Sequence, residues 1–215
     1  MRTVAVLPVK RFGAAKQRLS AGLDAPARAR LAEAMVRDVL DALGRARGLD
    51  GVVVVTSEPR AAGAAREAGA EVLADEREAG QSPAAALGVA LARDRGAERA
   101  LLVPGDCPAL DPGEVEALLA EPGDPPAVTI VPDRHGTGTN ALLLAPPDAI
   151  APAFGEGSFA RHVDAARAAA ALLTVREPPS LLLDVDTTED LAALRAQARA
   201  GPHTAAALEA TAPVG

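Results

Sequence analysis

The sequence predicts an α/β fold built on a doubly wound, mostly parallel sheet. Short apolar runs rich in β-branched residues alternate with longer stretches whose apolar residues recur at helical spacing. One run, residues 52–55, consists of four consecutive valines, which is typical of a parallel strand buried on both faces. The alternation continues through the first 120 residues and predicts four successive strand–helix units.

The ends of the predicted helices in this first half follow from local signals. Gly69 ends the second helix, Ser82 is expected to cap the third, and Pro112 lies in the first turn of the fourth. We expect strands at residues 4–7, 52–56, 70–73 and 100–103, and helices at 25–46, 59–68, 83–95 and 111–119.

The second half of the chain is more mixed. A Gly-rich turn at 133–140 separates two apolar runs, as in a hairpin. Residues 1–200 are predicted to form one domain, and the Ala-, Pro- and Thr-rich segment 201–215 is expected to be a flexible, frayed tail. We expect strands at 128–131, 141–144, 172–175 and 181–183, and helices at 158–170 and 187–200.

Composition excludes several classes of function. The net charge of −7 argues against a nucleic-acid or anionic-membrane partner. With no Trp or Tyr and only three Phe, the chain also has almost none of the aromatic platforms on which single-stranded nucleic acids stack. The single cysteine, Cys107, excludes an internal disulfide and a cysteine-based zinc site. No apolar run reaches membrane-spanning length and the N-terminal run is too short for a signal peptide, which predicts a cytoplasmic protein.

Both lysines of the chain, Lys10 and Lys16, follow the first predicted strand, whereas all other basic residues are arginines. A strand that leads into a basic loop with small residues is how α/β proteins hold phosphates. Lysine suits that role because it is a compact charge on a flexible stem. The alternative interpretation is a solvated basic loop.

Three aspartates follow predicted strands and indicate a metal site. Asp106 lies in a Pro- and Gly-containing turn after the strand at 100–103, where open α/β sheets bind ligands. Asp184 and Asp186 are two residues apart, so an extended backbone places both on one face, where they repel unless a cation lies between them. Carboxylates are suitable Mg²⁺ ligands. Alternatively, Asp106 opens a turn, and Asp186 or Thr187 caps the last helix.

Three further loops carry weaker signals. The 134–140 loop offers backbone N–H and hydroxyl donors suited to an anion, although a plain hairpin turn has the same composition. Ser158 follows two glycines at a predicted helix start, which is typical both of an anion site and of an ordinary N-cap. Gln81 precedes another predicted helix. Its side chain could contact the edge of a nucleotide base, and the alternative is that it is simply exposed. The three histidines show no metal-ligand spacing.

In combination these segments resemble the guanylyltransferases of coenzyme F420 biosynthesis. The resemblance covers about residues 1–200 and implies a nucleotidyltransferase-like (GT-A, Rossmann-like) three-layer sandwich with a mostly parallel mixed sheet. Members of that family join GMP from GTP to a small phosphorylated three-carbon acid and release pyrophosphate. The matching segments occur in the family's order, at residues 8–19, 104–108, 136–142, 154–162 and 184–187.

The resemblance also implies roles for individual residues. Mg²⁺ would be held by Asp106, Asp184 and Asp186, and the acceptor acid by Thr139, Gly155 and Ser158, with Thr137 an alternative to Thr139. The catalytic residues would be Lys16 and Asp106. The nucleotide would be bound by Pro8, Lys10, Lys16, Ser82 and Gly105.

The acceptor and the partners are less sharply defined. Family members use phosphoenolpyruvate in the actinobacterial type and 2-phospholactate in the archaeal type, and the GC-rich composition favours phosphoenolpyruvate. A molybdenum-cofactor-type cytidylyltransferase and a catalytically silent nucleotide-binding domain are the alternatives. A homodimer is compatible with the sequence, which carries no interface signature.

Overall fold

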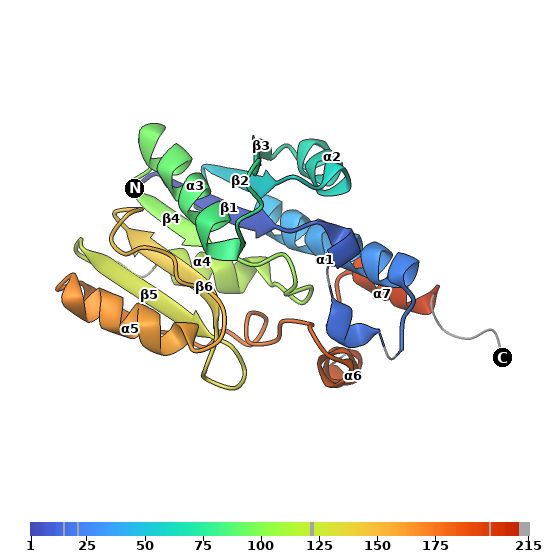
Figure 1. Ribbon diagram of the computed structural model, residues 1–215. Helices are drawn as coiled ribbons and strands as arrows, with labels where there is room; N and C mark the ends of the chain where they lie inside the picture. Colours follow the sequence, from blue (N-terminus) through green and yellow to red (C-terminus); the bar gives the residue numbers. More distant parts are fainter. Residues whose placement is uncertain (15, 21, 121–122, 198, 211–215) are drawn as a thin grey trace.

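One seven-stranded sheet organises the chain, in the order β3-β2-β1-β4-β6-β5-β7 (Figure 1). The structure is a computed structural model that describes residues 1–210 except 15, 21, 121–122 and 198. Its strands are β1 (Thr3–Val9), β2 (Gly51–Thr56), β3 (Glu71–Ala74), β4 (Arg99–Leu102), β5 (Ala127–Pro132), β6 (Thr139–Ala145) and β7 (Leu172–Val175).

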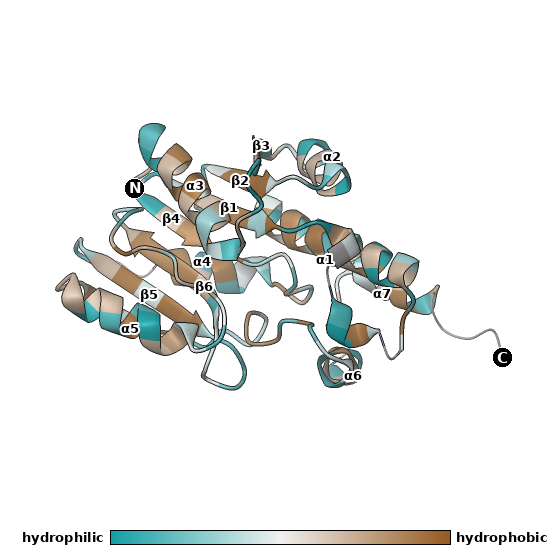
Figure 2. Ribbon diagram, in the orientation of Figure 1, coloured by the Kyte–Doolittle hydropathy of each residue, from teal (hydrophilic) through white to brown (hydrophobic). Residues whose placement is uncertain are grey.

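Helices cover both faces of the sheet, which gives three layers. Both layers pack apolar side chains, mainly alanine, leucine and valine, against β1, β2, β4, β5 and β6. The sheet between them is mostly hydrophobic (Figure 2). The first layer contains α1 (Ala25–Arg45), α2 (Pro59–Glu67) and α4 (Pro112–Ala120), and the second contains α3 (Gln81–Asp94) and α5 (Ser158–Ala168).

Strand directions bring the ends of two distant segments to one edge of the sheet. Strands β1 to β4 are parallel to one another, and β7 is parallel to β5, whereas β6 is antiparallel to β4 and β5. The sheet is therefore mixed and mostly parallel, as the sequence predicts. Because β6 runs against β4, it begins near the edge at which β4 ends, and this places Thr139 toward the loop that carries Asp106.

The predicted strand at 181–183 is wrong. Its residues form a turn and an irregular segment, with Leu181 and Leu183 buried beneath neighbouring helices and loops. The segment lies beside the end of β4, and β4 already pairs with β1 on one side and β6 on the other, so β4 offers it no free edge. The apolar run therefore indicates that this segment is buried, but it does not indicate that the segment pairs in a sheet.

The C-terminal segment also differs from the expected frayed tail. The predicted helix at 187–200 is shorter, α6 (Thr188–Gln197), and it is followed by α7 (Pro202–Glu209). Helix α7 lies against α1 (Figure 1), and its Leu208 joins a third apolar cluster with Leu31 and Met35 of α1. This part of the expected tail is ordered because it covers an apolar face of α1; residues 211–215 lie outside the described residues.

Within the described ranges, 1–210 with its gaps, no helix is both long and apolar enough to span a membrane.

Candidate active site

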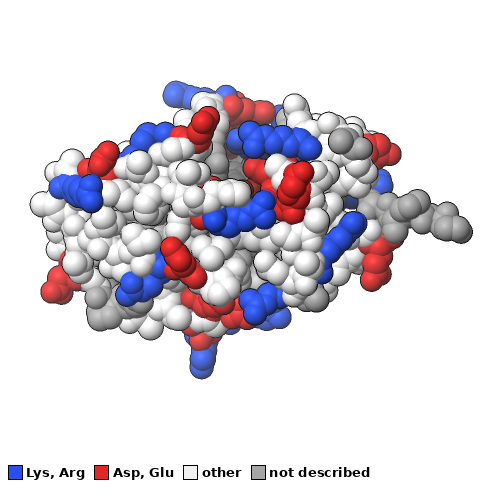
Figure 3. Space-filling view, turned by 90° about the horizontal axis from the view of Figure 1, so that it is seen from below, with Lys and Arg blue, Asp and Glu red and all other residues white. Residues whose placement is uncertain are grey.

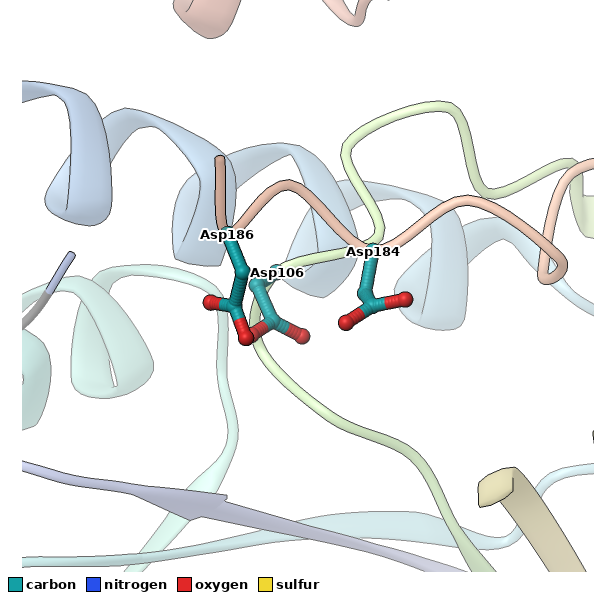
Figure 4. Close-up of side chains that lie close together, drawn as sticks. All are labelled: Asp106, Asp184 and Asp186. Atoms are coloured by element: carbon teal, nitrogen blue, oxygen red, sulfur yellow. The ribbon is translucent and has the colours of Figure 1, made fainter. Parts of the chain in front are cut away.

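Three carboxylates meet at the edge of the sheet where β4 ends. Asp106 comes from the loop after β4, and Asp184 and Asp186 come from the irregular segment before α6 (Figure 4). One oxygen atom of each carboxylate lies within 4.8 Å of one oxygen of the other two. The predicted convergence of the three aspartates is therefore present in the structure.

The shared face of Asp184 and Asp186 comes from extended backbone rather than from a strand. Leu183 and Val185 alternate with them and are buried, so the two carboxylates point to the opposite side. The Val185 N–H donates to the carbonyl oxygen of Asp106 at 3.0 Å, which fixes this segment beside the β4 loop. The Asn140 side-chain amide donates to the carbonyl oxygen of Leu181 at 2.8 Å and to Asp184 Oδ1 at 3.3 Å.

A capping box holds the end of the same segment. The Asp190 N–H donates to Thr187 Oγ1 at 3.2 Å, and Asp190 Oδ2 accepts from the Thr187 N–H at 2.7 Å and from the Asp186 N–H at 3.0 Å. Asp190 also pairs with Arg134 of the β5–β6 loop at 2.6 Å. Thr187 and Asp190 therefore begin α6, which leaves the carboxylate of Asp186 free for the cluster.

Lys16 lies against two members of the carboxylate cluster. Its Nζ donates to Asp106 Oδ2 and to Asp186 Oδ1, each at 2.7 Å, and its side chain is only 7% exposed. Burial alone lowers the pKa of Lys16, but the two carboxylates outweigh burial and raise that pKa above its ordinary value. The backbone of Lys16 is left-handed, with φ of 56°, a conformation uncommon for a residue other than glycine.

Two features of the carboxylates fit a cation. Burial, together with the charges of Asp106 and Asp186, raises the pKa of Asp184 to about 6. Asp106 Oδ1 is buried and has no hydrogen-bond partner in the described part of the chain. A buried acceptor without a partner is costly, and a divalent cation bound by carboxylate oxygens would satisfy it.

The cluster opens into a cavity of about 590 Å³. The face of the molecule in Figure 3 shows a hollow bordered by interspersed basic and acidic side chains, with no field of a single sign. Among the residues expected to bind nucleotide, Pro8, Lys10, Lys16 and Gly105 line the cavity. Proline lacks a backbone N–H, but Pro8 is tolerated in β1. The pairing of β1 with β4 ends at Val6, so no hydrogen bond between the two strands is lost at Pro8.

Ser82 does not have the position that the sequence predicts. Helix α3 begins at Gln81, two residues earlier than predicted, and its N-cap is Gly80, with φ of 115°, a backbone conformation that L side chains rarely adopt. Ser82 lies within the first turn and is not among the residues that line the cavity, whereas Gly80 and Gln81 are. The predicted N-cap is therefore wrong by two residues.

The residues expected to hold the acceptor form a second group beside the carboxylates. Thr139 begins β6, next to Asn140, which binds Asp184. The Phe159 N–H donates to the Thr137 carbonyl oxygen at 3.1 Å and brings the start of α5 to this loop. Gly155 and Ser158 are joined by a turn bond of 3.0 Å, and Ser158 is buried.

Sequence reasoning left a residue of this second group without a role. His162 is fully buried on α5; its Nδ1 lies 2.9 Å from Thr139 Oγ1, and its Nε2 accepts from the Ala153 N–H at 2.9 Å. Thr137, by contrast, is exposed and donates hydrogen bonds to Asp133. A usable signal was the spacing of four between Ser158 and His162, which places both on one face of α5.

Asn140, which supports Asp184, also lacked a prediction. The alternative in which Thr187 caps the last helix is present in the structure, with Asp190 completing the capping box, and it leaves Asp186 in the carboxylate cluster. Cys107, expected to be a packed residue, is fully buried, and burial raises the pKa of its thiol well above the ordinary value. The thiol is therefore not a reactive nucleophile.

Comparison with known proteins gives the family. A family model described as "Guanylyl transferase CofC like" matches residues 3–200, which contain both groups of site residues. The chain belongs to the CofC-like guanylyl transferase family.

Curated relatives of the CofC-like chain include proteins named phosphoenolpyruvate guanylyltransferase. A protein of Conexibacter woesei named phosphoenolpyruvate guanylyltransferase is 52% identical over 196 residues, which are 91% of this chain and 88% of that protein. A protein of the same name from Rubrobacter xylanophilus is 42% identical over 91% of this chain and 95% of its own length.

Solved structures show the same fold as the CofC-like chain at low sequence identity. A structure titled as a putative nucleotide-diphospho-sugar transferase from Desulfovibrio desulfuricans has a TM-score of 0.76 at 18% identity, over 98% of this chain and 95% of that one. A CMP:2-keto-3-deoxy-manno-octonic acid synthetase complexed with CTP has a TM-score of 0.60 at 17% identity, over 92% and 98%. The fold is nucleotidyltransferase-like, as the sequence predicts.

Proposed function

We propose that this protein is a phosphoenolpyruvate guanylyltransferase, which transfers GMP from GTP to phosphoenolpyruvate and releases pyrophosphate. The observation that carries the proposal is the carboxylate cluster with Lys16 at the mouth of a cavity large enough for a nucleotide. The relatives named phosphoenolpyruvate guanylyltransferase, which match over nearly the whole chain, support the choice of acceptor. The product of this reaction is enolpyruvyl-2-diphospho-5'-guanosine, a compound of coenzyme F420 biosynthesis.

The reaction needs positioning and charge neutralisation more than acid–base chemistry. A phosphate oxygen of the acceptor attacks the α-phosphorus of GTP, the new P–O bond forms, and the bond to pyrophosphate breaks with the electron pair leaving on pyrophosphate. The acceptor phosphate is already ionised near neutral pH, so no general base is required. The chain's task is to hold two polyanions in line.

Lys16 serves this task from a fixed position. Two of its three N–H donors hold Asp106 and Asp186, which leaves one donor for a phosphate oxygen of the leaving group. Because it is buried and paired, Lys16 stays charged throughout the reaction. On the acceptor side, Thr139 and Ser158 provide hydroxyl groups and Gly155 provides a backbone N–H for the phosphate and carboxylate of the acid.

Asp106, Asp184 and Asp186 would hold Mg²⁺, because their oxygens converge and Asp106 Oδ1 needs a partner. When bound, such an ion supplies neutralisation of the charge that develops on the phosphate oxygens. Asn140 and Asp190 keep Asp184 and Asp186 in place for it.

The test is pyrophosphate release from GTP, ATP or CTP with Mg²⁺, in the presence of phosphoenolpyruvate, 2-phospholactate or no acceptor. We expect release with GTP and phosphoenolpyruvate together. Release only with 2-phospholactate would change the acceptor, release only with CTP would favour a cytidylyltransferase, and no release in any combination would favour a silent binding domain.

The carboxylates themselves are tested by Asp184→Asn and Asp186→Asn. We expect turnover to fall by at least roughly 100-fold, because charge stabilisation at the phosphates is lost. The metal-free melting temperature of Asp184→Asn should stay the same or rise, since burial and like charges disfavour the ionised form of Asp184. Asp164→Asn, at an exposed position on α5, is the matched control. Near wild-type turnover in the double variant would contradict the assignment.

A further inference from the structure

The cavity extends well beyond the carboxylate cluster, toward the edge of the sheet at β3. Asp75 follows β3 directly, and Asp106 lies in the loop after β4. Three strand spacings separate β3 from β4 in the sheet, or about 14 Å. Both aspartates line the same cavity. That span suits a nucleotide whose phosphates lie at the carboxylate cluster and whose base lies at β3.

Two carboxylates line the β3 end of the cavity, and one of them is already neutralised. Glu78 receives two bonds from Arg11 Nε, at 2.8 and 3.0 Å, and the ion pair with Arg11 lowers the pKa of Glu78. The backbone of Glu78 is left-handed, with φ of 46°. The Glu78 carboxylate is therefore already paired with Arg11 and is not available to a ligand.

Asp75 is the carboxylate that remains available. It is 9% exposed, and its Oδ1 accepts from the Glu78 N–H at 3.1 Å, which orients the side chain. In the described part of the chain no lysine or arginine forms a salt bridge with Asp75, and its Oδ2 has no hydrogen bond among those found there. A carboxylate offers only acceptors, so the missing partner must be a donor.

Among the common bases, guanine fits this requirement. Its N1–H and its 2-amino group lie side by side and both donate, so one carboxylate accepts from both. Adenine and cytosine present a ring-nitrogen acceptor beside their amino group, and that lone pair would face a carboxylate oxygen. An acidic group in a cavity for a polyanion is otherwise repulsive.

We propose that Asp75 selects guanine, by accepting hydrogen bonds from N1–H and the 2-amino group of GTP. This inference rests on the proposed function and names the specificity-determining residue of its nucleotide site. Glu78 and Arg11 position Asp75, because the loop bond to its Oδ1 holds the carboxylate toward the cavity.

The test is Asp75→Asn, compared on GTP and xanthosine triphosphate. Xanthine has a carbonyl oxygen in place of the 2-amino group. The asparagine oxygen can keep the bond from the Glu78 N–H, and its amide then faces the cavity as a donor. We expect kcat/KM for GTP to fall by roughly 10- to 100-fold, the loss of a charge-assisted hydrogen bond, and the preference to shift to xanthosine triphosphate. Glu76→Gln removes an equal charge one residue away, outside the cavity, and should keep the preference for GTP.

Either of two results would overturn the inference: Asp75→Asn that keeps the GTP preference, or wild-type protein that takes both nucleotides equally well. The second comparison needs no variant to fold. A gain on xanthosine triphosphate cannot come from a misfolded chain. If the wild-type protein releases no pyrophosphate with any acceptor, the proposed function fails. Calorimetric binding of the two nucleotides to the wild-type protein and to Asp75→Asn then still tests Asp75.

Discussion

His162 determines how a neighbouring hydroxyl can be used. Its Nε2 accepts from the Ala153 N–H, so the neutral ring carries its proton on Nδ1 and donates it to Thr139 Oγ1. The Thr139 hydroxyl proton is then left to point elsewhere, toward the expected acceptor. Burial, with a smaller contribution from the charge of Arg161, lowers the pKa of His162 to about 4, which keeps the ring neutral.

This buried ring should make stability depend on pH. Because the pKa of His162 is lower in the folded chain than its ordinary 6.5, the unfolded chain binds the proton first as pH falls. The wild-type protein should therefore lose about 3 kcal/mol between pH 7 and pH 4 relative to His162→Phe. Urea unfolding of both proteins at several pH values measures the difference. Parallel curves for the two proteins would show that His162 is not the cause.

At the level of residues, the contacts of His162 are the part of the site that the sequence could not predict. The aspartates and Lys16 were predictable, because each follows a predicted strand and local sequence patterns indicate where those strands end. The partners of His162 come from β6 and from the loop before α5, 23 and 9 residues away. Nothing near His162 in the sequence indicates either contact.

At the level of elements, Asp38 fixes helix α7 onto helix α1. Asp38 is buried within α1, yet its Oδ1 accepts from the His203 N–H at 3.0 Å and its Oδ2 from the Thr204 N–H at 2.8 Å. These N–H groups lie in the first turn of α7, where a helix leaves its donors unpaired. Gly201 makes the approach possible, because a Cβ there would lie 2.3 Å from the Asp38 carboxyl carbon.

Removing this contact should loosen α7. Asp38→Ala leaves the buried Thr204 N–H and the part-buried His203 N–H without an acceptor, and we expect the free energy of unfolding to fall by about 2 kcal/mol. Asp41→Ala, less than one helical turn further along, removes an exposed pair with His203 and should change it by less than about 0.5 kcal/mol. Chemical denaturation measures both. An equal loss of unfolding free energy in the two variants would mean that the Asp38 contact stabilises the fold no more than the exposed Asp41–His203 pair.

Element prediction succeeded where the hydrophobic period was clear. The valine run became β2, and the long amphipathic stretch became α1 within one residue. It failed at 181–183, where three leucines are buried or partly buried without joining a sheet, and at 202–209, where an alanine-rich segment is helical because α1 offers it a surface. Both failures have the same cause: tertiary contacts decided the outcome.

At the level of the whole molecule, the family model ends at residue 200, before α7 begins. Leu208 of α7 nevertheless packs with Leu31, Met35 and Leu194, so α7 closes an apolar cluster that α1 and α6 share. The three layers and the convergence of the loops follow from the alternation of elements. The cavity and the position of Asp75 in it depend on how α3 and the loop after β3 pack together. Local sequence patterns do not predict this packing.

Ending the chain at residue 200 should therefore weaken the whole fold. The truncated chain exposes this cluster, and we expect a lower melting temperature and a lower urea midpoint than in the full chain. Leu208→Ala, which removes only one buried side chain, should cost about 2 kcal/mol, and the truncation should cost more. A truncated chain as stable as the full one would show that α7 adds nothing to the fold.

The contact between Phe154 and His162 has a practical consequence. Their rings meet edge to face, 5.4 Å between centroids, beside the residues expected to hold the acceptor. Since the chain contains no Trp or Tyr, the protein has almost no intrinsic fluorescence of its own. Phe154→Trp would thus create a lone fluorophore at that loop, on a dark background, and arrival of the acceptor acid could be followed directly by light.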